Sequence, residues 1–183
     1  MANSTLITYR LKRKILTFTN KISRKASAPD RKFIADMVYG ILASKSCLLT
    51  DIADRLHEPA KKIHSVDRLS RHLKKGIPAS VSASYLQTVK KMVPSDPVVL
   101  IDESDVVKPE GKHFEALGIV RDGSESTRTK NVYKKGYHVT EACALTATKH
   151  PVSIFSRIHS SAEKGYKSVN TITFDAIRQA AAL

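Results

Sequence analysis

The chain has 183 residues, of which 42% are hydrophobic and 26% charged, and its formal net charge is +14. This composition is typical of a folded globular protein with a buried core and excludes a disordered chain. No apolar run approaches the roughly 18 residues of a membrane helix, and the first residues lack a signal peptide's apolar stretch. We therefore expect a cytoplasmic protein with no membrane partner.

The positive charge is concentrated in the first half of the chain. Residues 1–95 carry 19 Lys and Arg against 6 Asp and Glu, a net charge of +13, whereas residues 96–183 carry 12 against 11, a net charge of +1. Such a field attracts polyanions and makes their binding salt-dependent, so nucleic acid is the predicted partner. Cys47 and Cys143 lie far apart and fit neither a zinc ribbon nor a disulfide scaffold.

The N-terminal segment, residues 9–32, interleaves basic and apolar residues, and we interpret it as a basic arm, either helical or partly disordered. From Asp30 onward, apolar residues recur at spacings of three and four, which predicts an amphipathic helix. Asp30 is its candidate N-cap, and the SKS segment at residues 44–46 is expected to end it.

Two further helices are predicted to form a helix-turn-helix. LTDIADRL at residues 49–56 reads as a short helix, and His57-Glu58-Pro59 breaks it because proline disfavours helix at the preceding residue. A second helix follows and closes at Gly76. A short helix, a tight break and a longer basic helix are typical of DNA-binding helix-turn-helix units. The apolar positions of the second helix are Ile63, Val66, Leu69 and Leu73, and its candidate DNA contacts are Lys61, Lys62, Arg68, Arg71, Lys74 and Lys75. The alternative is that these cations only face solvent.

A domain boundary is predicted near residue 95. An amphipathic helix beginning at Ser80 or Ser82 stops at VPSDP, residues 93–97, where charge balance, proline content and periodicity all change. The first domain is therefore residues 1–95 and the second residues 96–183.

The second domain is predicted to be mainly β. VVLI at residues 98–101 is a continuous apolar run, as expected for a strand covered on both faces. Residues 113–120 are either a short strand or an irregular segment, and residues 137–148 and 152–160 form a predicted hairpin. In its second strand, Val152, Ile154 and Ile158 are expected on one side and Phe155 on the other. A last helix is expected over TITFDAIRQAAAL, with Phe174, Ile177 and Leu183 buried.

Carboxylates follow the first predicted strand directly. Asp102 comes immediately after VVLI, with Glu103 and Asp105 close behind. Enzymes that cut phosphodiesters often hold Mg²⁺ or Mn²⁺ with carboxylates at strand ends, so Asp102 is a candidate catalytic residue and metal ligand. In extended geometry Asp102 and Ser104 share one face, while Glu103 points away. The alternative is that Asp102 is a turn or capping residue.

The chain resembles the DDE transposases of bacterial insertion sequences. The matching segments are LLTDIADRL, VDRLSRHL, VVLIDESDVVKPEGKHFEALG, KKGYHV and the HPVSIFSRIHS hairpin, which together span roughly residues 30–175. The resemblance implies an α+β fold in which a helical N-terminal DNA-binding domain precedes a ribonuclease H-like mixed sheet. It implies that Asp102 is the first acid of the catalytic triad and that the complete enzyme uses Mg²⁺ or Mn²⁺.

The same resemblance implies an incomplete catalytic domain. In that family three antiparallel strands precede a helix, and the second Asp and the Glu follow later, whereas this chain ends inside the helix. Asp175 is read as a solvent-facing or capping residue. We therefore expect a truncated transposase that binds the terminal repeats of an element as duplex DNA, singly or as a homodimer, and is inactive alone. The alternatives are a non-catalytic DNA-binding regulator derived from a transposase and, less favoured because aromatic residues are only 6%, an RNA-binding protein.

Overall fold

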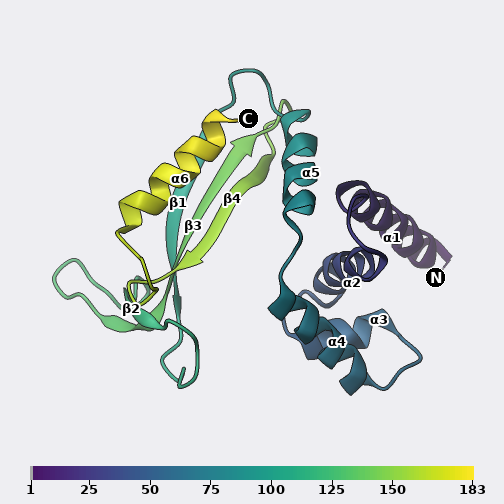
Figure 1. Ribbon diagram of the computed structural model, residues 1–183, viewed down its shortest axis with the longest axis horizontal. Helices are drawn as coiled ribbons and strands as arrows, with labels where there is room; N and C mark the ends of the chain where they lie inside the picture. Colours follow the sequence, from purple (N-terminus) through teal and green to yellow (C-terminus); the bar gives the residue numbers. More distant parts are fainter. Residues whose placement is uncertain (1) are drawn as a thin grey trace. The chain divides into compact units, whose positions relative to one another are not determined.

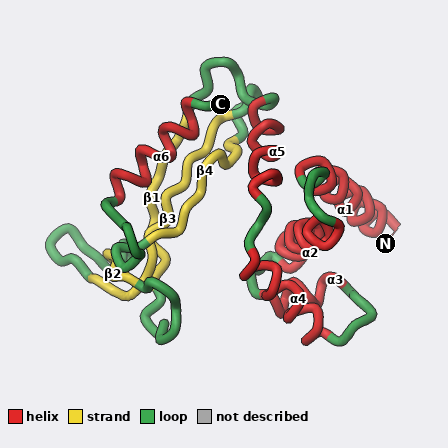
Figure 2. Tube along the Cα trace, in the orientation of Figure 1, coloured by secondary structure: helices red, strands yellow, loops and turns green. Residues whose placement is uncertain are grey.

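The computed structural model describes the backbone of residues 2–183 and the side chains from residue 8 onward. The chain divides into two compact units, Met1–Thr88 and Val89–Leu183. The division lies a few residues before the predicted boundary. Among the described residues, strands occur only in the second unit, as the yellow segments of Figure 2 show. The protein is therefore α+β, as predicted.

The first unit is helical. Its elements are α1 (Ala2–Ile22), α2 (Ala28–Ser44), α3 (Leu49–Leu56), α4 (Lys62–Lys75) and most of α5 (Ala79–Lys90). Helices α2 to α5 enclose a core that includes Phe33, Ile34, Ile52, Leu69 and Val81. Helix α1 packs against α2 and buries Ile15, Thr19 and Ile22. The segment predicted as a basic arm is thus helical up to Ile22 and belongs to the packed unit.

Helix α2 begins earlier than predicted, at Ala28, and its N-cap is Ser27 rather than Asp30. The Ser27 Oγ accepts a hydrogen bond from the Asp30 backbone N–H at 3.4 Å and donates one to the Asp30 carboxylate at 2.6 Å. Asp30 therefore lies in the first turn, where a negative charge is stabilised by the helix dipole. The helix ends at Ser44, within the expected SKS segment, and its C-cap Lys45 has a left-handed backbone conformation.

The predicted break between α3 and α4 is confirmed. Helix α3 ends at Leu56, its C-cap His57 has a φ of 50°, and α4 begins at Lys62. The C-terminal cap of α4 is Gly76, with a φ of 82° that favours glycine. The predicted apolar face of α4 is wrong in part, because Ile63 and Leu73 are 59% and 48% exposed.

The close approach of α2 and α3 depends on Gly40. A Cβ atom at this position would lie 2.4 Å from the Ile52 Cγ2 atom, so only glycine allows the two helices to pack at this distance. Among the described helices, none is long and apolar enough by itself to cross a membrane, and α2 and α3 reach that threshold only as a pair bent by 99°.

The second unit is one antiparallel sheet with a covering helix. Its elements are β1 (Val99–Val107), β2 (Gly118–Arg121), β3 (Tyr133–Leu145), β4 (Pro151–His159) and α6 (Val169–Ala181). Strand β3 is central: β1 pairs with one of its edges, and β2 and β4 pair with successive parts of the other. The predicted β3–β4 hairpin is confirmed. All described pairings are antiparallel, so the expected mixed sheet is not what these residues form.

A β-bulge in the hairpin alters the predicted facing of β4. The pairing passes from Ala142 with Phe155 to Cys143 with Ser153, which leaves Ile154 as the extra residue. Ile154 is consequently buried, whereas Ile158 is 63% exposed. The expectation that Ile154 and Ile158 share one side is therefore wrong, because the alternation of side chains is interrupted between them.

Helix α6 covers one face of the sheet, as Figure 1 shows for the yellow helix beside β1, β3 and β4. It buries Ile172 and Ala176, whereas Phe174 and Ile177, which we expected to be buried, are 58% and 47% exposed. Strand β1 also differs from its prediction. Leu100 is 53% exposed because α6 covers only one of the two faces.

Candidate functional site

Asp102 lies in the middle of β1, on the sheet face opposite to α6. The neighbouring Glu103 faces the helix, because its carboxylate accepts a hydrogen bond from the Thr173 hydroxyl of α6 at 2.9 Å. Since successive side chains of a strand point to opposite faces, Asp102 and Ser104 share the uncovered face. Both are exposed. Asp102 is thus a strand residue, not the turn or cap that was the alternative.

The residue directly opposite Asp102 on β3 is Glu141. Directly opposed side chains of an antiparallel pair have Cβ atoms about 4.5–5.5 Å apart, and like charges there destabilise the sheet. Two carboxylates therefore lie on one open face. Beside them, burial and then the Glu141 carboxylate raise the pKa of the Cys143 thiol.

The donors around Asp102 do not fit a two-metal centre. In the part of the chain that the structure describes, no three His, Cys, Asp or Glu side chains form a group that could hold a metal ion. Two divalent cations need carboxylates from several elements, and Asp102 faces one other carboxylate across the ladder. The described residues therefore do not complete the site for Mg²⁺ or Mn²⁺ that the resemblance implies.

A polar cluster that the sequence did not reveal lies on the α6 face. The Asp105 carboxylate contacts His138 Nδ1 at 2.8 Å across the β1–β3 ladder. The His138 ring stacks on His159 of β4, and His159 in turn stacks on Tyr166. Histidine spacing in the sequence gives no signal for this cluster, because the strand register brings its members together.

His159 is fully buried in this cluster. Its Nε2 atom lies 2.9 Å from the Thr140 hydroxyl, and its Nδ1 atom has no hydrogen-bond partner among the described residues. Burial lowers the pKa of His159, and the charge of His138 adds to this effect. The neutral imidazole is therefore favoured.

The candidate DNA contacts of α4 divide into two groups. Three of the six cations are held in ion pairs within the first unit: Lys62 with Asp54 at 2.6 Å, Lys75 with Asp30 at 2.7 Å, and Arg68 with two acids. The other three, Lys61, Arg71 and Lys74, are exposed and have no acidic partner among the described residues.

Arg68 is the centre of a charged network between helices. Its guanidinium contacts Asp36 of α2 at 2.8 Å and Glu58 of the α3–α4 turn at 3.0 Å. Hydrogen bonds from Lys32 and Ser65 to Glu58, together with Arg68, lower the pKa of Glu58 to about 2. The network fixes α4 and its preceding turn against α2. Arg68 therefore has a structural role.

One side of α4 is hollowed and basic. A surface pocket of about 370 Å³ is lined only by Arg68, Arg71, His72 and Lys75. His72 is positioned there by stacking on the core residue Phe33. This surface is suited to an anionic group such as a phosphate.

No family model, curated protein or solved structure matches this chain in sequence or structure comparisons.

Proposed function

We propose that the chain is a DNA-binding protein of the insertion-sequence transposase type, which binds duplex DNA through its helical unit in the cytoplasm and does not cleave DNA alone. The observation that carries this proposal is the net charge of +13 over residues 1–95, placed on a unit in which a short helix, a left-handed turn and a longer basic helix follow one another. A duplex carries closely spaced phosphates, so a surface of this charge binds it with a strong salt dependence.

Helix α4 is the proposed recognition element. Lys61, Arg71 and Lys74 are available for phosphates or base edges, because no acid of the described residues neutralises them. The other three candidates are ion-paired and orient the helix: Lys62, Arg68 and Lys75. Each could contact a DNA phosphate only after breaking its ion pair with an acidic side chain. A helix of this type enters the major groove, which is wide enough to admit it. The terminal repeats of an element would be its ligand.

The second unit supports a transposase origin. Three antiparallel strands, β1, β3 and β4, are followed by helix α6, in the order expected for the start of a ribonuclease H-like domain. Asp102 lies on the first of these strands. On its other edge, β1 has no strand partner in the described part of the chain, which leaves room for a further strand beside Asp102.

A second candidate is a non-catalytic DNA-binding regulator derived from a transposase. The possible metal ligands around Asp102 favour this second candidate. The residue opposite Asp102 is Glu141, and the described residues form no group that could hold a metal ion. The two candidates share DNA binding and differ in competence: the first is a portion of an enzyme whose catalytic site is incomplete in this chain, and the second acts without any catalysis.

Binding and cleavage by the full chain test the proposal together. Affinity for a labelled duplex, measured at increasing salt, is expected to fall steeply. Equal affinity at low and high salt would contradict the electrostatic basis. Incubation with plasmid DNA and Mg²⁺ or Mn²⁺ is expected to give no strand cleavage, for the wild type as for Asp102→Ala. Cleavage that disappears in Asp102→Ala and persists in the control Asp175→Ala would show instead that the chain is catalytic.

A further inference from the structure

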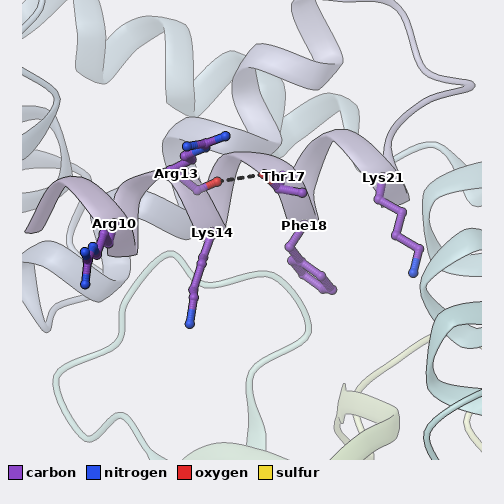
Figure 3. A pocket seen from close by; sticks show the side chains of 6 residues that line it. All are labelled: Arg10, Arg13, Lys14, Thr17, Phe18 and Lys21. Atoms are coloured by element: carbon purple, nitrogen blue, oxygen red, sulfur yellow. Dashed lines mark hydrogen bonds between the residues drawn. The ribbon is translucent and has the colours of Figure 1, made fainter. Parts of the chain in front are cut away.

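The exposed face of α1 carries a row of cations that the helix-turn-helix does not explain. Arg10, Arg13, Lys14 and Lys21 line a shallow surface pocket of about 400 Å³ together with Thr17 and Phe18. In Figure 3 the side chains of Arg10, Lys14, Phe18 and Lys21 leave the helix on the same side. We name this surface, made by the six residues of the pocket, the α1 stripe.

The α1 stripe faces away from the packed side of the helix. The packed side presents Ile15, Thr19 and Ile22, which are buried. At 100° per residue, the four cations and Thr17 point more than about 100° away from the mean direction of these three, whereas Phe18 lies at the border between the two sides. The spacing of the basic residues along the sequence therefore places them together on one side of α1, and the packing of α1 on α2 fixes that side toward solvent.

The charges of the stripe are not neutralised. None of Arg10, Arg13, Lys14 and Lys21 forms an ion pair in the described part of the chain, in contrast to Arg68 and Lys75 of α4. The first acid in the sequence is Asp30, which already binds Lys75. Four cations on one helix face without a counter-charge repel each other. An anionic partner would relieve that repulsion.

The length of the stripe matches a nucleic-acid backbone. With a rise of about 1.5 Å per residue, Arg10 and Lys21 lie roughly 16 Å apart along the helix axis. One DNA strand has a phosphate about every 3.4 Å of duplex axis, so this length corresponds to about five phosphates. The stripe contains no acid and one aromatic side chain, Phe18, which suits charge contact with a backbone better than recognition of bases.

A membrane surface fits less well. An interfacial helix places one broad apolar face in the lipid. In α1, Ile15 and Ile22 pack within the unit, and the exposed apolar side chains are divided, with Tyr9 and Leu16 on the other side of the helix from Leu11 and Phe18. On the stripe itself, Phe18 is the only apolar side chain, and the Thr17 hydroxyl donates to the Arg13 carbonyl at 2.9 Å. The charged groups of such a surface can donate hydrogen bonds to phosphate oxygens.

We propose that the α1 stripe is a second, sequence-independent contact with the phosphate backbone of duplex DNA, separate from α4. This inference rests on the proposed function, because it assigns a further part of the same ligand to α1. It gives α1 the role of holding the duplex, whereas α4 reads it.

Three triple variants of the full chain test the inference. The first changes Arg10, Lys14 and Lys21 to Gln, the second changes Lys61, Arg71 and Lys74 to Gln, and the control changes Lys149, Lys164 and Lys167 of the second unit to Gln. Each removes three positive charges from exposed positions. Gln keeps a good helix propensity, and circular dichroism with thermal unfolding checks that each variant is folded. Affinity is measured for two duplexes of unrelated sequence over a range of salt.

The α1 variant is expected to bind both duplexes more weakly by the same factor. The slope of log affinity against log salt should fall by about 0.9 for each phosphate that the variant no longer neutralises, thus by about 2.7 for three, with no such change in the control. A second outcome separates the two proposals: the wild type binds duplex, the α4 variant binds it more weakly, and the α1 variant binds it as the control does. In that case the inference about α1 is wrong and the proposed function stands. If the wild type binds neither duplex, the proposed function fails first.

Anionic vesicles provide the competing outcome. Vesicles with phosphatidylserine are mixed with the wild type and the α1 variant at the same salt. Vesicle binding that is abolished in the α1 variant, together with unchanged duplex affinity, would assign the stripe to a membrane surface and overturn the proposal. Duplex affinity that falls in the α1 variant, with little vesicle binding by either protein, supports it.

Discussion

His138 and His159 stack on neighbouring strands, with ring centroids 5.6 Å apart and ring planes inclined by 28°. The two imidazoles are in different electrostatic surroundings. His138 contacts the Asp105 carboxylate at 2.8 Å, whereas His159 is fully buried between His138 and Tyr166. Burial disfavours a positive charge on His159 and lowers its pKa.

The buried His159 makes the second unit sensitive to acid. Burial lowers its pKa in the folded chain below the ordinary value of 6.5, so the unfolded chain binds a proton first as the pH falls. The free energy of unfolding is expected to decrease as the pH drops below about 6.5 and to be unaffected by this group above it. The other charged groups near the ring, Glu103, Arg157 and Glu163, do not reverse this direction.

Thermal unfolding between about pH 8 and pH 5 measures this effect. His159→Gln, which can still hydrogen-bond to Thr140, should lose the part of the pH dependence due to this ring. The exposed His150→Gln is the matched control. An unchanged pH dependence in His159→Gln would contradict the prediction.

Local signals in the sequence predicted the ends of elements. The break at His57 and the cap at Gly76 are confirmed. Proline disfavours helix at the residue before it, and glycine readily adopts the positive φ that ends a helix, whatever packs around them. The hairpin of residues 137–160 was also predictable, since apolar and β-branched residues fill both strands.

Features that depend on distant residues were not predictable. The stack of His138 on His159 depends on strand register, and the pairing of Arg68 with Asp36 depends on helix packing. The exposure of Phe174 and Ile177 has the same cause. Which face of a helix is buried depends on the layer it meets, and here α6 buries the small Ala176 against the sheet. Asp102 could be identified as a candidate because it follows a predicted strand. Its pairing with Glu141 could not be predicted, because it depends on the register of β1 and β3.

Replacement of Gly40 by alanine is expected to destabilise the first unit, although alanine is the better helix former by about 1 kcal/mol. The added Cβ would meet the Ile52 side chain at 2.4 Å, and overpacking of this kind costs about 1–3 kcal/mol. Chemical denaturation measures the difference. Gly123→Ala, at a position where nothing lies within 4 Å of the added Cβ, is the control. A more stable Gly40→Ala variant would show that α2 and α3 separate at no cost.

Substitution by glutamine is expected to affect different properties at Arg68 and Arg71: stability at Arg68 and duplex affinity at Arg71. Arg68→Gln removes contacts to Asp36 and Glu58 and should lower stability by about 1.5–3 kcal/mol, the usual range for hydrogen bonds to charged groups. Arg71→Gln should leave stability within about 0.5 kcal/mol, because the side chain is exposed. The Arg71→Gln variant should therefore remain folded and bind duplex DNA more weakly than the wild type. Chemical denaturation and binding to a labelled duplex measure the two effects.

The acid dependence of this network gives an independent check. Lys32, Ser65 and Arg68 hold the pKa of Glu58 at about 2, below its ordinary value of 4.5. The stability that this carboxylate contributes is present above pH 4.5 and is lost as the pH falls toward 2. Glu58→Gln should lack that loss. If Arg68→Gln were as stable as the wild type and bound DNA poorly, Arg68 would be a DNA contact and not a structural residue.

Removal of the Asp102 charge is expected to stabilise the second unit. Asp102 and Glu141 are directly opposed on β1 and β3, and like charges in such a pair cost roughly 0.2–1 kcal/mol. Asp102→Asn should therefore raise the free energy of unfolding at neutral pH by an amount in that range. Asp105→Asn is the matched control, because it lies on the same strand but contacts His138 on the other face, and it should lower stability. A carboxylate that the fold keeps against its own stability is the pattern expected of a functional residue. If Asp102→Asn were destabilising, the carboxylate would be a structural residue of the sheet, and the case for a transposase origin would lose its candidate acid.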